Sequence, residues 1–412
     1  MREQLGREEY EALALALSGE PVVSIRLNSH KPADLFAGAE TVPWCAEGRY
    51  LERRPQFTLD PLLHAGCYYV QEASSMYISH LLKTLPSPFT GIAEQCPEKG
   101  SRGGQATLWQ NIRGLCLDLC AAPGGKSTLL LNDLPQDVVL IANEAIRQRA
   151  HILRENIIKW GSPNAVVTNN FAADFQPLGA VFDMILCDAP CSGEGMFRKD
   201  PASIGEWSLR NVEMCRQRQR QIVADIWPTL REGGLFIYST CTYNHFEDED
   251  NVAWIASTLG ADVVPQEDCR EWGISGGHFY PHHTRGEGFF VAALRKKGDG
   301  KAKTPDLKKL HRSLNILLEG VEAGRVVDKK GTIEPSQSEA MCWTTDRNRW
   351  PTHELSTDEA LSYLRAEALH LPPDIQRGYV MLTYRQHPLG FCKNIGNRAN
   401  NLYPAEWRIR KK

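Results

Sequence analysis

The apolar residues after about position 115 follow the pattern of a mostly parallel β-sheet. Short, nearly uninterrupted apolar runs are each followed by a polar or glycine-containing break and usually by a helical pattern. We expect six strands of this kind: LCLDL (115–119), VVLIAN (138–143), AVVT (165–168), FDMILCD (182–188), GLFIYST (234–240) and GEGFFVAALRK (286–296). Strands that are apolar at almost every position are buried on both faces. The pattern therefore predicts an α/β fold with helices on both sides of the sheet.

Three parts of the chain can be separated by composition. The segment KKGDGKAKTPDLKK (296–309) is rich in Lys, Gly and Pro and indicates a domain boundary. Beyond it, a helical stretch followed by YVMLTYR and PLGFCKNIG predicts a small α+β domain. We expect an N-terminal region over 1–88, the α/β domain over 89–297, and a linker with the small domain over 298–412. Residues 91–113 are polar and Gly-rich, which predicts a loop or insertion before the first strand.

The composition is typical of a globular protein that works in the cytoplasm. The 412 residues are 42% hydrophobic and 24% charged, and no window approaches 18 uninterrupted apolar residues. The chain starts with the charged, amphipathic segment MREQLGREEYEALALALSGE, which lacks the features of a secretory signal. We expect no membrane partner. The 12 cysteines are scattered and include no C-x2-C pair, so we expect reduced thiols and no metal site.

The charge distribution points to a nucleic-acid partner that the net charge of −3 conceals. Up to Leu294 there are 25 basic and 36 acidic residues, whereas the remainder has 22 basic and 14 acidic. From Arg377 onward, eight basic residues and a single acid, Glu406, are interleaved with five aromatic rings: Tyr379, Tyr384, Phe391, Tyr403 and Trp407. Two interpretations stay open. The rings stack on RNA bases while the basic residues neutralise phosphates, or the rings form the core of a small domain.

The first strand runs directly into CAAPGGKST (120–128), at the strand end where ligands of parallel sheets bind. Small residues and two glycines let backbone N–H groups approach a ligand and then begin a helix. The spacing matches neither G-x-G-x-x-G nor the P-loop, which argues against a dehydrogenase and a nucleoside triphosphatase. Glu144 follows the second strand, where it either accepts hydrogen bonds from a ribose or simply begins a helix.

Two cysteines and one aspartate follow neighbouring strands of the same sheet. Asp188 and Cys191 lie in DAPCSGEG (188–195), and Cys241 lies in STCTYN (239–244). Carbon 5 of a pyrimidine is a poor nucleophile until a thiolate adds to carbon 6, and a carboxyl group at N3 stabilises the charge that then develops. A second group is needed when the C5 proton and the thiol leave. Two thiols and an acid meet these requirements without a metal.

The motifs DLCAAPGGKST, ANE, DAPCSGEG and YSTCTYN together resemble those of the NOL1/NOP2/Sun family of RNA cytosine-C5 methyltransferases. RLN (26–28), GCYYVQEASSM (66–76) and PHHTRGEGFF (281–290) are also similar to the family pattern. The tail from Gly378 resembles the PUA-like RNA-binding module of the bacterial 16S ribosomal RNA members. The resemblance implies a Rossmann-like methyltransferase that uses S-adenosylmethionine and binds 16S ribosomal RNA or the small ribosomal subunit. It also implies that the protein acts as a monomer.

The resemblance also implies a role for individual residues. The family's cofactor loop falls on Cys120, Ala121, Ala122, Pro123, Gly124, Gly125 and Lys126. Its ribose-binding acid falls on Glu144, and its active-site lysine is similar to Lys126. The nucleophile falls on Cys241 and the cysteine that helps release the product on Cys191. Asp188 contacts the target base beside the cofactor. The residues alone do not rank the two cysteines, since DNA cytosine methyltransferases attack from a Pro-Cys dipeptide such as 190–191.

The chain departs from the family pattern after the third strand. Where the family often has an aspartate that bonds the adenine amino group, this chain reads TNNFAAD. Either Asn170 replaces that contact through its amide, or Phe171 packs on the adenine.

Our interpretation is an S-adenosylmethionine-dependent 16S ribosomal RNA cytosine-C5 methyltransferase. Three alternatives remain: a transfer RNA methyltransferase of the same family, a non-catalytic RNA-binding ribosome-assembly factor, and a methyltransferase for small molecules.

Overall fold

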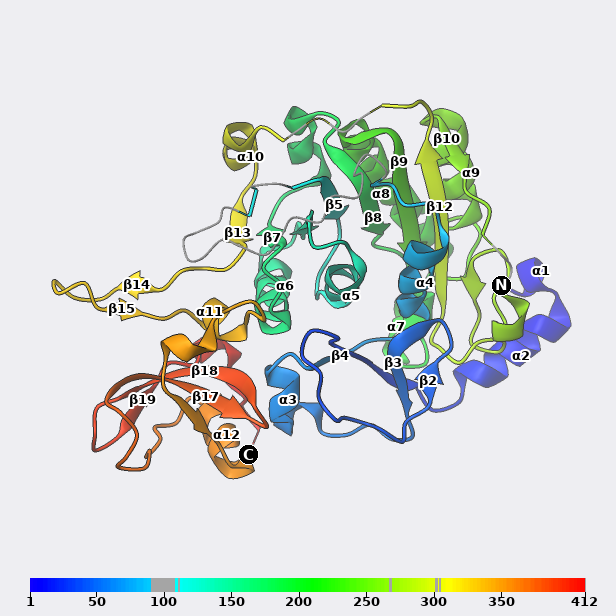
Figure 1. Cartoon of the computed structure of the whole chain (residues 1–412). Coiled ribbons are helices and arrows are strands. Elements are labelled where there is room, and N and C mark those ends of the chain that lie inside the picture. Colours follow the sequence, from blue (N-terminus) through cyan, green and yellow to red (C-terminus); the bar gives the residue numbers. More distant parts are fainter. Residues whose placement is uncertain (90–107, 110–111, 267–268, 301–302, 304, 412) are drawn as a thin grey trace.

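A nine-stranded sheet forms the centre of the protein in the computed structural model, which describes residues 1–89, 108–109, 112–266, 269–300, 303 and 305–411 (Figure 1). The strand order is β10-β12-β9-β8-β5-β6-β7-β13, with β11 paired to β12. The bounds are β5 (Gly114–Asp118), β6 (Val138–Asn143), β7 (Ala165–Thr168), β8 (Phe182–Asp188), β9 (Leu230–Thr240), β10 (Ala261–Val263), β11 (His278–Phe279), β12 (Phe289–Lys296) and β13 (Ile316–Glu319). The five strands β5 to β9 are parallel, and β12 closes one side in the antiparallel sense.

The six predicted strands are confirmed, and their apolar runs are explained by burial on both faces. Successive residues of β5 enter opposite cores: Cys116 lies in one, and Leu115 and Leu117 lie in the other. Helices α5 (Gly125–Asp133) and α6 (Arg147–Trp160) contribute to the first core. The second core includes residues of α8 (Leu209–Ile226), α9 (Glu249–Thr258) and α10 (Leu307–Ser313). The protein therefore has the Rossmann-like α/β architecture expected from the sequence.

The strand β13 was not predicted from the sequence. It pairs with β7 at the edge of the central sheet, whereas we expected residues 298–412 to form only a linker and the small C-terminal domain. Only Leu318 of its four residues is buried, as is usual for an edge strand, and its apolar run of three residues is shorter than most runs of the central strands. The insertion predicted over 91–113 lies mostly outside the described residues.

The N-terminal region forms a small antiparallel sheet in the order β2-β3-β1-β4. Its elements are α1 (Arg2–Leu5), α2 (Arg7–Leu17), β1 (Val23–Leu27), β2 (Thr41–Val42), β3 (Cys45–Leu51), α3 (Pro61–His64), β4 (Tyr68–Val70) and α4 (Tyr77–Thr84). Arg26 fastens this sheet to the central domain: it is 1% exposed, donates to Thr128 Oγ1 at 2.6 Å and lies 4.5 Å from the Trp160 ring. The arginine of the RLN motif therefore joins the N-terminal sheet to the central domain.

The C-terminal module is built around a four-stranded sheet in the order β16-β17-β18-β19. Its elements and those that lead into it are β14 (Arg325–Val326), β15 (Ile333–Glu334), α11 (Gln337–Met341), β16 (Thr352–Glu354), α12 (Thr357–Leu364), β17 (Gly378–Tyr384), β18 (His387–Asn394) and β19 (Ala399–Asn401). The central domain also contains the short helix α7 (Ala202–Glu206). The module contacts α3 through α12 and β18. Figure 1 shows it beside α3, with the β14–β15 hairpin extending outward.

The aromatic residues of the tail form a core. Tyr384, Phe391, Tyr403 and Trp407 are each at most 8% exposed, and Tyr403 packs edge-on against Trp407 and against Tyr363. The interpretation that these four rings stack on RNA bases is therefore wrong, because a small module needs them to exclude water from its own interior. The RNA binding expected of this module would then depend on other side chains.

No helix among the described residues has the length and apolar character needed to cross a lipid bilayer.

Candidate active site

The loop after β5 is held open by backbone contacts to the neighbouring elements. Ala121 N–H donates to the carbonyl of Asn143 at 2.8 Å, and Asn156 Nδ2 donates to the carbonyl of Pro123 at 2.8 Å. Gly124 has a φ of 115°, a conformation that side-chain-bearing residues rarely adopt, and α5 begins at the next residue. The loop therefore lines a cavity at the point where it runs into the N-terminus of α5.

That cavity joins the loop to the N-terminal sheet and to two predicted catalytic residues. It is lined by residues 120–123, Gly125, Lys126 and Asp188, and on the opposite side by residues of β4 and the segment after it, including Tyr69 and Gln71. Any group bound there contacts both the glycine-containing loop and the Lys126–Asp188 pair. Gly125 packs closely against Tyr69, since a Cβ there would lie 3.3 Å from the ring and would make a tight contact.

Asp118, at the end of β5, is a buried acid that sequence reasoning did not single out. Its Oδ2 accepts from Ser127 Oγ at 2.6 Å, whereas Oδ1 is buried without a hydrogen-bond partner among the described residues. Burial raises the pKa of Asp118 to about 7. Asp118 thus ties the strand to α5 and leaves one acceptor beside the cofactor loop, which fits the binding of a group with N–H donors.

Glu144 follows β6, and Asn170 lies between β7 and the 3-10 helix η3 (Ala172–Leu178); both lie outside the lining of that cavity. Glu144 is 4% exposed, accepts from Ile146 N–H at 2.9 Å and lies 3.4 Å from Arg149 Nη1. The Asn170 amide already accepts from Asn315 N–H at 2.9 Å and donates to Asp174 at 3.3 Å. Phe171 is 70% exposed. Of the two alternatives for the adenine, Phe171 has the accessible surface.

The structure brings the two predicted cysteines into contact. Cys191 Sγ and Cys241 Sγ lie 3.3 Å apart, on the turns that follow the adjacent strands β8 and β9. The hydrogen bond from Cys191 lowers the pKa of the Cys241 thiol, an effect opposed by burial and by Asp188 and assisted by Lys126. The same hydrogen bond, together with burial, raises the pKa of Cys191 well above its ordinary value. Cys241 is also the more exposed of the two.

Asp188 and Lys126 form an ion pair next to the thiols. Lys126 Nζ lies 2.8 Å from Asp188 Oδ2, and Ser239 Oγ donates to Asp188 Oδ1 at 2.8 Å. Burial alone would lower the pKa of Lys126, but the carboxylate of Asp188 raises it above its usual value. Lys126 therefore stays charged, and its positive charge favours a thiolate at Cys241.

Two buried glutamates set the distance between the cysteine turns, and sequence reasoning missed both roles. Glu194, from the Cys191 turn, accepts from Thr242 Oγ1 and Tyr243 N–H, each at 2.6 Å. Glu247, from the segment after Cys241, accepts from Ser192 N–H at 3.0 Å and from Gln219 Nε2 at 2.7 Å. Each turn thus carries a carboxylate that holds the other. The only sequence signal was the glutamate within the quoted DAPCSGEG motif.

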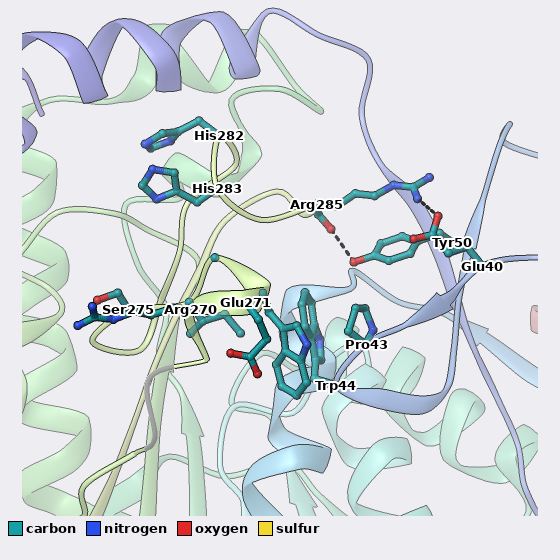
Figure 2. A pocket seen from close by; sticks show the side chains of 13 residues that line it. Glu40, Pro43, Trp44, Tyr50, Arg270, Glu271, Ser275, His282, His283 and Arg285 are labelled. Carbon is teal, nitrogen blue, oxygen red and sulfur yellow. Dashed lines mark hydrogen bonds and ion pairs between the residues drawn. The ribbon is translucent and has the colours of Figure 1, made fainter.

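A second cleft is walled by the N-terminal sheet and by the segment that contains PHHTRGEGFF (Figure 2). Tyr50 Oη donates to the carbonyl of Arg285 at 2.9 Å, and the Arg285 guanidinium lies 2.5 Å from Glu40 and 4.3 Å from the Tyr50 ring centre. On the other side of the segment, Glu9 Oε2 lies 2.8 Å from His282 Nε2 and 2.9 Å from His283 Nε2. The N-terminal region thereby positions the segment that leads to Gly288.

Gly288 connects this segment to the catalytic turn. Its φ is 109°, and a Cβ there would lie 2.0 Å from the Tyr243 ring. Tyr243 Oη donates to the carbonyl of Glu287 at 2.7 Å, while the Glu287 side chain pairs with Arg198 at 2.8 Å. The segment before Gly288 consequently contacts both the N-terminal region and the turn that carries Cys241.

Three family models match successive parts of the chain. The model described as 16S rRNA methyltransferase RsmB/F matches residues 107–295. The model for the N-terminal domain of 16S rRNA methyltransferase RsmF matches residues 1–73, and the model for the methyltransferase RsmF PUA domain matches residues 351–409.

Named relatives and solved structures agree with these matches. Ribosomal RNA small subunit methyltransferase F of Salmonella paratyphi A is 29% identical over 453 residues, covering 93% of this chain and 89% of its own. The structure of NSun6 from Pyrococcus horikoshii with SFG superposes with a TM-score of 0.56 at 21% identity, over 72% of this chain and 97% of that one. A methyltransferase homologue from the same organism gives a TM-score of 0.55 at 24% identity over the same shares. These structural likenesses concern the fold.

Proposed function

Because this chain belongs to the RsmB/F family of 16S rRNA methyltransferases, we propose that it methylates carbon 5 of a cytosine in 16S ribosomal RNA through a covalent bond between Cys241 and carbon 6. Family membership makes it an RNA methyltransferase. The observation that carries the finer proposal is the 3.3 Å contact between two thiols beside the Lys126–Asp188 ion pair.

The two thiols have different tasks in this proposal. Cys241, with its lowered pKa and greater exposure, adds to carbon 6 as a thiolate, which breaks the 5,6 double bond and makes carbon 5 nucleophilic. When bound, S-adenosylmethionine supplies the electrophilic methyl group. Cys191, 3.3 Å from the reacting sulfur, then accepts the C5 proton in its thiolate form; the electron pair of the C5–H bond restores the 5,6 double bond as the C6–S bond breaks and Cys241 leaves as a thiolate.

Asp188 and Lys126 position the base and keep the nucleophile charged. Ser239 and Lys126 hold the carboxyl group of Asp188 in the lining of the cavity, where it can bond N3 of the target cytosine when a proton lies between these two acceptors. The neighbouring Lys126 favours the thiolate form of Cys241 through its positive charge. Cys120 to Gly125 and Glu144 are proposed to hold the cofactor, and SFG in the archaeal NSun6 structure, an S-adenosylmethionine analogue, supports that use.

The proposed substrate also implies a role in RNA binding for the N-terminal region and the C-terminal module. The target base leaves its stack to meet Cys241, which costs about a few kcal/mol that contacts elsewhere offset. We propose that the N-terminal region (1–88) and the module within 298–412 supply those contacts around the methyltransferase domain (89–297). We also propose that the protein acts as a monomer in the cytoplasm, since both thiols, the lysine and the aspartate come from one chain.

Loss of the gene for this protein is expected to remove one 5-methylcytosine from 16S ribosomal RNA. Bisulfite sequencing of ribosomal and transfer RNA from cells with and without the protein measures this directly, because 5-methylcytosine resists the conversion that cytosine undergoes. The control is re-expression of the intact chain, which should restore the signal at the same position. A missing signal in transfer RNA instead would favour the transfer RNA alternative.

The two remaining alternatives are separated by purified components. Absence of transfer from radiolabelled S-adenosylmethionine to small-subunit RNA would favour the non-catalytic assembly factor. Unchanged activity on a small substrate after deletion of residues 298–412 would favour the small-molecule methyltransferase.

The change Glu144→Gln is expected to raise the Kd for S-adenosylmethionine about tenfold or more. A hydrogen bond to a charged acceptor contributes about 1.5 to 3 kcal/mol, and Glu144 is a buried acid at the strand end where a ribose is expected. Isothermal titration calorimetry measures the effect, with Glu206→Gln, an exposed residue at the end of α7, as the matched control. An unchanged Kd would mean that Glu144 only begins α6.

A further inference from the structure

A basic pocket of about 530 Å³ lies between the N-terminal region and the C-terminal module. One wall is the segment after β1, with His30, Lys31 and Asp34. The opposite wall consists of Arg347, which begins a short 3-10 helix, and of the β17–β18 turn with Arg385 and His387. Neither part contains the pocket by itself, so it exists only where the two domains meet.

The two walls are fixed to each other by direct contacts. The His30 ring stacks on the Trp343 ring at 4.1 Å with an interplanar angle of 12°. Lys31 Nζ donates to the carbonyls of Ala65 at 2.9 Å and Lys159 at 2.7 Å, so the residues around the pocket are anchored to α3 and α6 as well. The pocket is therefore preformed.

The pocket contains positive charge that the protein does not neutralise. Asp34 is the single acid of its lining, and neither Arg347 nor Arg385 forms an ion pair with a carboxylate of the described residues. Burial and the nearby Arg347 both lower the pKa of Lys31, to about 7, and burial, Lys31 and Arg347 lower the pKa of His387. These groups repel one another, and a bound anion would relieve that repulsion.

The tip of the β17–β18 turn is held in an uncommon conformation. Arg385 and Gln386 have φ values of 47° and 66°, and both are side-chain-bearing residues in a region that favours glycine. Glu354 stabilises the turn by accepting from Gln386 N–H at 3.3 Å and from Thr383 Oγ1 at 2.5 Å. Its carboxylate is thus used by the turn itself, while the Arg385 side chain lines the pocket.

We propose that this pocket binds a backbone phosphate of the RNA substrate, with Arg347 and Arg385 as the principal contacts; the inference rests on the proposed function. Guanidinium groups bind phosphate oxygens through paired N–H donors, which suits two unpaired arginines facing one concave site. The C-terminal module lies beside α3, and β4 of the same N-terminal region lines the cofactor cavity. An RNA bound in the pocket therefore contacts both the C-terminal module and the N-terminal region, and the latter also lines the cofactor cavity.

The double change Arg347→Ala and Arg385→Ala is expected to weaken binding of a 16S ribosomal RNA transcript about tenfold or more. It should also make the plot of log K against log salt concentration less steep by about 1 to 2, because each lost phosphate contact contributes about 0.7 to 0.9 to the slope. Filter binding over a series of salt concentrations, with the full chain, measures both quantities. Thermal melting reports whether the variant is folded.

Two control variants separate a site from a general effect of charge. Arg210→Ala with Arg218→Ala removes the same charge from exposed positions of α8 and should change affinity less than twofold. Arg347→Lys with Arg385→Lys should keep the salt slope, since it keeps both charges. An unchanged slope in the pocket variant, or an equal change in the α8 variant, would overturn the proposal.

A free phosphate ion shares the chemistry of an RNA phosphate and is tested separately. If the arginine variant lost stabilisation by millimolar inorganic phosphate in thermal melting while its RNA slope stayed unchanged, the RNA proposal would be wrong. Failure of the proposed function is distinguishable, because methyl transfer is not the readout: a protein that binds RNA through this pocket but does not methylate it would contradict only the earlier proposal.

Discussion

Cys241→Ala is expected to abolish methyl transfer to RNA, with a fall in single-turnover rate on the order of 10⁴ or more, because removal of a nucleophile leaves carbon 5 unactivated. The side chain is exposed on a turn, so its truncation creates no core cavity and the fold should be retained. Transfer from radiolabelled S-adenosylmethionine to small-subunit RNA measures the rate, and calorimetry should show the cofactor still bound.

The matched control for this variant is Cys215→Ala. Cys215 is a buried thiol on α8 and belongs to neither of the turns that carry Cys191 and Cys241, so its loss should leave the transfer rate within a few fold of the parent. If Cys241→Ala retained the parent rate, the covalent mechanism would have to be abandoned, whatever the cysteine geometry suggests.

Much of this site could be predicted from the sequence because its parts follow strand ends. The carboxyl ends of parallel strands meet at one edge, so the residues after β5, β8 and β9 had to lie near each other whatever the helices did. The contact between Cys191 and Cys241 confirms that they are neighbours. The sequence gives no ranking of the two thiols from residue types alone, whereas exposure and the hydrogen bond between them both favour Cys241 as the thiolate.

The features that the sequence did not predict depend on partners far along the chain. Glu194 is held by residues about fifty positions later, and Glu247 reaches back to the Cys191 turn, so neither has a local pattern. The burial of Tyr403 and Trp407 likewise depends on Tyr363 and on the module's own sheet. Composition identified the tail as basic and aromatic but could not decide which of those groups face water.

The interdomain pocket illustrates the same limit. Arg347 and Arg385 are unremarkable in sequence, and their importance comes from the fact that neither forms an ion pair with a carboxylate of the described residues. The opposing wall is supplied by residues more than 300 positions earlier. Charge counting pointed to RNA at the C-terminal end, and the N-terminal region supplies the opposite wall of the pocket proposed to bind it.

Cys191→Ala is expected to trap a covalent complex between the protein and its RNA. The variant keeps Cys241, Asp188 and Lys126, so the thiolate still adds to carbon 6 and the methyl group is still transferred. It lacks the group 3.3 Å from the reacting sulfur that assists when the C5 proton and the thiol leave, so the bond to carbon 6 persists. A denaturing gel should show a slowly migrating protein–RNA species whose abundance rises at least several-fold over the parent.

The gel experiment also tests which cysteine forms the bond. The double variant Cys191→Ala with Cys241→Ala should give no retarded species, and omission of S-adenosylmethionine should reduce the species formed by Cys191→Ala, because the trap closes after methyl transfer. A complex that formed in Cys241→Ala and was absent in Cys191→Ala would reverse the two roles. In that case the nucleophile would be the cysteine of the Pro-Cys dipeptide, and the lowered pKa of Cys241 would describe a proton acceptor instead.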